Sequence, residues 1–245
     1  MTAALRAEWS KIRTLPDFAL LLALTVVLTV AVSAASSAAG GNGPDPVHAA
    51  LLGVQLGQAV AAIAGVQILA GEYGSGLIHP TLLAVPRRSR VLGAKAALLA
   101  GGVAAAALAA LGGSALAGWL LLPSLPAGGL PRAVTGSVLY LVLIALLGLG
   151  TAAVVRNTVA AVGVVLSLLY VLPVVMEMLT DPQWQRWVYR LTPSSAAQSL
   201  QTTVATSALP LGPWPALAVT AGWSIGALAL GLLLLTRRDA IAYGS

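Results

Sequence analysis

Few residues of this 245-residue chain have side chains that could do chemistry, and their spacing matches no common catalytic arrangement. The chain has seven acidic residues, two histidines and no cysteine. It contains no GxxxxGK[ST] phosphate-binding loop and no HExxH motif. His48 and His79 lie in different segments, and neither segment offers enough further ligands for a metal ion. The sequence therefore predicts no catalytic residue, no metal site and no ATP hydrolysis by this chain.

Two glutamines, Gln55 and Gln58, are polar side chains inside a long apolar run. One interpretation is that they face a central pathway, and the other is that they form hydrogen bonds between helices. Glu177, just beyond a later apolar run, is a further pathway candidate that could equally be solvated beside Asp181. The run that holds the glutamines also carries a stripe of small residues, which favours close packing of helices: Gly53, Gly57, Ala61 and Gly65.

The composition places these residues in a membrane. Hydrophobic residues make up 58% of the chain and charged residues only 8%, whereas soluble domains contain about 25% charged residues. The mean hydropathy is +0.92, and the apolar residues come in continuous runs rather than in alternation with polar ones. Such runs form helices, because a barrel strand alternates between lipid and lumen. We therefore expect an all-α integral membrane protein with a single transmembrane domain.

Six uncharged runs predict six transmembrane helices. The first has 21 residues and would be about 31 Å long as a helix, which matches a hydrocarbon core of about 30 Å. Only Arg156 and Asn157 separate the fourth run from the fifth, so these two helices form a tight hairpin. The predicted spans are residues 18–38, 49–70, 91–122, 133–155, 158–176 and 214–236.

The distribution of basic residues predicts the orientation of the spans. With six spans, ten basic residues fall on the side that holds both termini and three on the other. The positive-inside rule then places both termini in the cytoplasm. This asymmetry also accounts for the high isoelectric point, so we expect no nucleic-acid partner. The Ala-, Gly- and Leu-rich composition favours a multi-pass protein of a bacterial plasma membrane.

The lack of charge inside the runs argues against ion-coupled transport. Proton and sodium carriers commonly keep ionisable groups at the middle of the membrane, where such groups are costly to hold. Here charged residues lie only near the ends of the runs, as at Lys95 and Glu177. A secondary carrier is therefore the weaker alternative, and a non-transporting scaffold or sensor subunit is another.

The N-terminal segment, residues 1–17, is amphipathic. Apolar side chains fall on one helical face and basic ones elsewhere, namely Leu5, Trp9 and Ile12 against Arg6, Lys11 and Arg13. We expect a helix that lies on the membrane surface before the first span. The alternative is an ordinary positively charged flank.

Two further segments outside the runs carry information. Residues 71–90 form the longest internal segment on the basic side, which makes them either a docking surface for a soluble partner or a passive linker. Pro80 suits the first turn of a short helix there. Residues 177–213 on the other side hold several aromatic residues. A helix over residues 194–209 would make this segment a re-entrant hairpin, and an ordinary structured loop is the alternative.

Several motifs, in order along the chain, resemble those of ABC-2-type transporter permeases, the membrane-spanning subunits of bacterial ATP-binding cassette exporters. They are RAEWSKIRT at residues 6–14, GEY at 71–73, GLI at 76–78, PTL at 80–82, VPRR at 85–88, Lys95, and LTPSSAAQSL at 191–200. The six-span layout extends the resemblance over the whole chain. Gly74 and His79 depart from the family pattern, in which basic residues are frequent at these positions.

The resemblance implies a mechanism. Arg6, Trp9, Lys11 and Arg13 would belong to a connecting helix, and residues 71–90 would hold a coupling helix that docks on an ATPase. Glu72, Tyr73, Pro80, Leu82 and Leu83 would make that contact, with Glu72 paired to a basic group on the ATPase or on the connecting helix. Two permease subunits, more often identical than different, would form the pathway among membrane lipids. Two ATPase subunits would bind ATP and Mg²⁺.

The predicted orientation can be tested with introduced cysteines, because the chain has none of its own. Cysteines at Thr2, Ser89 and Ser245 should react with an impermeant reagent only after the inner face is opened. Cysteines at Ser124 and Thr203 should react in intact cells. Labelling of the Ser89→Cys variant from outside would contradict the six-span topology.

Overall fold

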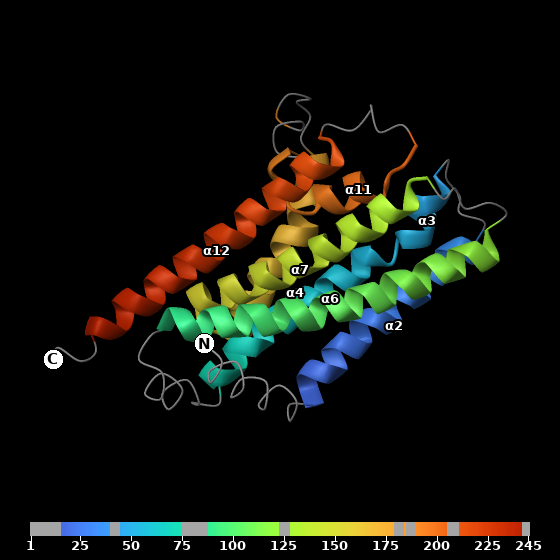
Figure 1. Cartoon of the computed structure of the whole chain (residues 1–245). Coiled ribbons are helices and arrows are strands. Elements are labelled where there is room, and N and C mark those ends of the chain that lie inside the picture. Colours follow the sequence, from blue (N-terminus) through green and yellow to red (C-terminus); the bar gives the residue numbers. More distant parts are fainter. Residues whose placement is uncertain are drawn as a thin grey trace.

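The computed structural model of the chain describes residues 16–39, 45–74, 88–122, 128–178, 184, 190–204 and 211–241. Regular structure within these ranges is helical, with no strand. The long helices run side by side in one bundle, and the short helices α3 (Pro46–Leu51) and α11 (Ser195–Gln201) lie at one end of it (Figure 1).

The prediction of six apolar helices of membrane length is confirmed. Two spans are composite: the second joins α3 to α4, and the fifth contains a π-helical turn, η1. The third span begins three residues earlier than predicted, and the helix of the sixth continues five residues further. The elements are α2 (Pro16–Ala38), α4 (Val54–Gly74), α6 (Arg88–Leu121), α7 (Leu130–Val155), α8 (Thr158–Leu166), η1 (Ser167–Val171), α9 (Leu172–Glu177) and α12 (Pro213–Ile241).

The second span and α7 form the centre of the bundle. In the span windows of the second and fourth helices 72% and 61% of the residues are buried, against 17% to 33% in the other four. α7 packs against α4, α6, α8 and α12, while α2 packs against α4 and α6. The outer helices instead expose large apolar side chains such as Trp119 and Val159, which suits a hydrocarbon environment.

Small residues allow the central helices to approach closely, as the predicted stripe on the second span indicated. A Cβ atom on Gly65 would lie 1.9 Å from the carbonyl oxygen of Ala145 in α7. Reciprocally, a Cβ atom on Gly148 would lie 2.3 Å from the carbonyl oxygen of Ala62 in α4. Gly53 at the other end of the stripe contacts Thr29 of α2, so the stripe serves two neighbours. Backbone-to-backbone contact of this kind is a main source of helix association in membranes.

A matching stripe of hydroxyl residues lies on α2, and the sequence analysis did not detect it. Its members recur every four residues and are buried against the second span: Thr25, Thr29, Ser33 and Ser37. The Ser33 hydroxyl accepts a hydrogen bond of 3.1 Å from the backbone N–H of Gly53. That N–H lies at the turn between α3 and α4, where the regular helical ladder is interrupted. The Ser33 hydroxyl therefore replaces the backbone acceptor that the Gly53 N–H lacks at this break in the helix.

The segment before the last span contains α11, which is shorter than the helix expected over residues 194–209. α11 ends at Gln201 because Thr202 has an extended backbone. It packs against α7 and α12, and Leu200 occupies the space next to Gly136 of α7. Six of its seven residues are buried, so α11 belongs to the bundle.

The close approach of α4 and α7 predicts that two glycine substitutions differ in their effect on thermal stability. Gly65→Ala should lower the thermal unfolding midpoint of the purified protein, because the new methyl group would collide with the backbone of α7. Gly112→Ala on α6 is the matched control, since a Cβ atom there meets nothing within 4 Å. The control should be neutral or more stable, by up to about 1 kcal/mol, since Ala favours helix over Gly. Equal midpoints for the two variants would contradict the packing.

Candidate functional site

Four side chains gather where the segment 75–87 leaves α4 and returns to α6. We call them the loop-end cluster: Glu72, Tyr73, Lys95 and Arg156. The Lys95 ammonium lies 2.8 Å from Oε1 of Glu72, which forms an ion pair between α4 and α6. The same ammonium donates a second hydrogen bond, of 3.3 Å, to the carbonyl oxygen of Ile68. These contacts tie the end of α4 to α6, about two helical turns after α6 begins.

This ion pair is almost completely withdrawn from solvent. The side chains of Lys95 and Glu72 are only 3% and 12% exposed. Each charge has lost hydration that only its partner and nearby polar groups replace, so neither can be removed alone without a large cost. Sequence analysis expected a partner for Glu72 on an ATPase or on the N-terminal helix. In the described structure its carboxylate binds Lys95 of the same chain, while the N-terminal segment of that expectation lies outside the described residues.

The second half of the loop-end cluster links the segment to the hairpin between the fourth and fifth spans. The guanidinium of Arg156 lies 5.7 Å from the ring centroid of Tyr73, within the range of a cation–π contact. Its Nη2 also donates a hydrogen bond of 3.5 Å to the carbonyl oxygen of Leu234 in α12. Tyr73 therefore connects α4 to α7 and, through Arg156, to α12.

The backbone at Arg156 makes the hairpin as tight as the sequence predicted. Arg156 has φ of 58°, in the left-handed region, and its N–H caps α7 by donating to Ala152. This conformation costs a non-glycine residue roughly 1–2 kcal/mol. Asn157 then begins α8, because its side chain accepts a hydrogen bond from Ala160. Two consecutive caps turn the chain within two residues and fix the position of the Arg156 side chain.

The two predicted pathway glutamines lie in a hydrogen-bonded network between helices. Gln58 is 1% exposed and accepts a hydrogen bond from the hydroxyl of Tyr140 in α7. Its amide donates to the side chain of Gln55 at 3.2 Å. The Tyr170 hydroxyl, on η1, donates to the backbone carbonyl of Gln55. Of the two interpretations left open by the sequence, this arrangement favours interhelical hydrogen bonding.

At the opposite end of the bundle, Asp45 ties α3 to the segment that follows α11. Its carboxylate caps α3 by accepting hydrogen bonds from the N–H groups of Val47 and His48. It also accepts from the hydroxyl of Thr203 at 2.8 Å and from the N–H of Val204 at 2.9 Å. Burial by itself raises the pKa of Asp45, but these hydrogen bonds outweigh it and hold the pKa below the ordinary value of 3.8. The stabilisation by these hydrogen bonds is therefore fully present above the ordinary pKa of an aspartate and is lost only as the pH falls further.

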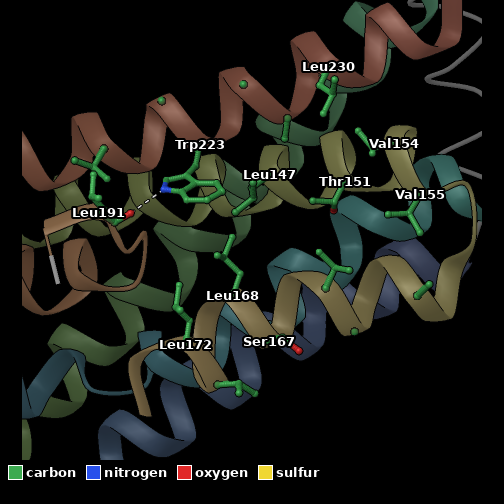
Figure 2. Close-up of a pocket in the computed structure, with 18 of the residues that line it drawn as sticks. Leu147, Thr151, Val154, Val155, Ser167, Leu168, Leu172, Leu191, Trp223 and Leu230 are labelled. Carbon is green, nitrogen blue, oxygen red and sulfur yellow. Dashed lines mark hydrogen bonds between the residues drawn. The ribbon is translucent and has the colours of Figure 1, made fainter. Parts of the chain in front are cut away.

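An apolar groove of about 1310 Å³ lies between α12 and the fifth span, with α7 as its floor. Figure 2 shows Trp223 from α12, Leu147 from α7 and Leu168 from η1 around this space. Apart from Trp223, the walls are valine, leucine, alanine and glycine residues, with Thr151 and Ser167 as the hydroxyl-bearing exceptions. No sequence signal marked this groove, because it depends on how α12 and the fifth span diverge over α7.

The sequence analysis overlooked one formal match to a catalytic pattern: residues 222–226 of α12 read GWSIG, which fits the GxSxG pattern of serine hydrolases. That motif requires a sharp turn between a strand and a helix, which exposes the serine. Here Ser224 lies inside a continuous helix and is buried. Its hydroxyl oxygen lies 2.7 and 2.9 Å from the carbonyl oxygens of Leu143 and Thr220, which share its single proton. The arrangement is that of a packing serine, not a nucleophile.

Several predicted site residues lie outside the described part of the chain. These are the connecting-helix residues Arg6, Trp9, Lys11 and Arg13 and the coupling residues Pro80, Leu82 and Leu83. Glu177 ends α9, but its side chain is not described either. Among the described residues, no cluster of His, Cys, Asp and Glu could hold a metal ion.

No family model matches the chain, and no curated protein matches it.

The ion pair between Glu72 and Lys95 predicts strongly non-additive effects on stability. Glu72→Gln or Lys95→Met alone should cost about 3–5 kcal/mol, because each leaves the other charge buried without its partner. The double variant should be closer to wild type than either single variant. Thermal unfolding of the purified protein would measure this, with the exposed Asp17→Asn as control. Additive losses in the double variant would contradict a buried pair.

Proposed function

We propose that this chain is the membrane-spanning permease subunit of an ABC-2-type ATP-binding cassette exporter. The chain would pair with a second permease subunit and be driven by two copies of a separate ATPase, which bind ATP and Mg²⁺. Its location would be a bacterial plasma membrane, with both termini in the cytoplasm. The order of the sequence motifs and the six apolar helices support this function.

The loop-end cluster is the observation that carries the proposal. A soluble motor can move membrane helices only through a contact that is stiff and connected to them. Residues 75–87 connect α4 to α6, and the buried ion pair ties these two helices together just inside the segment. Tyr73 extends the connection to Arg156 and, through it, to α12. Force applied to the segment would therefore reach four of the six spans.

The alternative of an ion-coupled carrier receives little support from the described spans. The buried ionised side chain within them is Lys95, which pairs with the half-buried Glu72 near the end of the bundle. A carrier would need an ionisable group that binds and releases its ion at the middle of the membrane. The central polar network consists instead of glutamine amides and tyrosine hydroxyls.

The proposal predicts that Leu82→Asp abolishes binding to, or stimulation of, the partner ATPase. Leu82 would be an apolar anchor of the coupling contact, and loss of such an anchor typically costs more than about 1 kcal/mol. Co-purification with the proposed ATPase subunit, followed by ATP hydrolysis assays, would measure the effect.

The matched control is Arg90→Gln, at an exposed position at the start of α6. This variant should retain the ATPase, because the arginines of the segment are expected to face lipid headgroups. Normal coupling in the Leu82→Asp protein, at normal expression, would show that residues 75–87 are a linker and would favour a scaffold function.

A further inference from the structure

The groove between α12 and the fifth span runs along much of the bundle. Its lining residues extend from Val219 to Leu230 on α12, a helical rise of about 16 Å, and from Ala160 to Val175 on the fifth span, a rise of about 22 Å. A hydrocarbon core is about 30 Å thick, so the groove is longer than one leaflet. On α7 the lining ends at Val155, directly before the hairpin. The groove therefore runs from the hairpin end of the bundle into the membrane.

Two of the polar side chains around the groove, Trp223 and Thr151, are already bonded within the protein. The Trp223 indole N–H donates to the carbonyl oxygen of Leu191 at 2.8 Å, as Figure 2 shows. The Thr151 hydroxyl donates to the carbonyl oxygen of Gly148 at 2.9 Å. A polar ligand would find little to bind, because entering the groove would strip its own hydration. A hydrocarbon ligand would lose no hydrogen bonds to water on entering the groove.

Three glycines in the lining differ from those at the helix contacts. A Cβ atom on Gly163, Gly222 or Gly226 would meet nothing within 4 Å, whereas Gly65 and Gly148 touch a neighbouring backbone. These three glycines widen the groove rather than bring two helices of this chain together. The resulting hollow is irregular. Its walls are α12 and the fifth span, which both pack against α7. A flexible chain fills such a concavity better than a straight helix, which packs by ridges and grooves.

The positively charged side chain of Arg156 lies at the hairpin end of the groove. Arg156 follows the lining residues Val154 and Val155, and its guanidinium is held by Tyr73 and by the carbonyl oxygen of Leu234. A guanidinium at headgroup depth attracts a phosphate, with which it can form charge-assisted hydrogen bonds.

We propose that this groove holds an acyl chain of an anionic phospholipid, whose phosphate lies at Arg156. The lipid belongs to the leaflet on the hairpin side. It fills the space between α12 and the fifth span, and its headgroup contacts the residue that links Tyr73 to α12. This inference does not depend on the transport function, because it concerns only the described spans and the bilayer around them.

The test is the phospholipid that stays with the protein after purification in mild detergent, identified and quantified by mass spectrometry. Wild-type protein should retain stoichiometric anionic phospholipid. Gly226→Phe should lower the retained amount about tenfold, because the ring occupies the groove and removes apolar contact. Gly112→Phe on α6 is the matched control, since its position is equally open but outside the groove, and it should retain the lipid.

A second pair of variants tests the headgroup contact. Arg156→Gln should retain less anionic than neutral phospholipid, whereas Arg190→Gln, exposed near the other end of the groove, should match wild type. Equal retention in the Gly226→Phe and wild-type proteins would overturn the proposal. So would a disulfide between two copies of a Gly226→Cys variant, because a second copy of the chain would then occupy the groove.

Discussion

The structure depends on one buried ion pair, between Glu72 of α4 and Lys95 of α6. Two opposite charges at the edge of a membrane are tolerated only as partners, because each is costly without the other. The pair holds together, near one end, the two helices that residues 75–87 connect. The contact of Tyr73 with Arg156, and of Arg156 with α12, depends on α4 holding this position. The proposed coupling function needs the same rigidity, since a loose joint would absorb the movement of a motor.

Close packing in the middle of the bundle lets a movement at one end of α4 reach the neighbouring helices. Glycine at positions 65 and 148 brings the backbones of α4 and α7 into contact, and the hydroxyl stripe of α2 meets the other end of the second span. The network of Gln58, Tyr140 and Tyr170 then joins the centre of α4 to α7 and to the fifth span. Displacement of α4 at one end of the bundle must therefore be shared by its neighbours. α12 and the fifth span both pack on α7 but diverge from each other, which leaves the apolar groove between them.

Sequence reasoning predicted the spans well, because length and hydrophobicity alone decide which segments cross a membrane. It also identified the glycine stripe on α4, since small residues at every fourth position lie on one helical face. It did not pair Glu72 with Lys95, although both residues were singled out, because 23 positions separate them and the pairing depends on the rotation of two helices. The partners of Asp45 and the groove were missed for the same reason. The hydroxyl stripe at residues 25–37 has the same four-residue period as the glycines and could have been found.

The proposed coupling function is tested most directly by a charge exchange, measured as stimulation of ATP hydrolysis by the proposed partner ATPase in reconstituted membranes. Glu72→Lys and Lys95→Glu each place two like charges in a buried site, so each variant should lose stimulation. The double exchange restores opposite charges and should recover most of it. A double variant that folds and inserts normally but stimulates no better than the single variants would contradict the claim that this ion pair carries the coupling. Single variants that stimulate like wild type would contradict it equally.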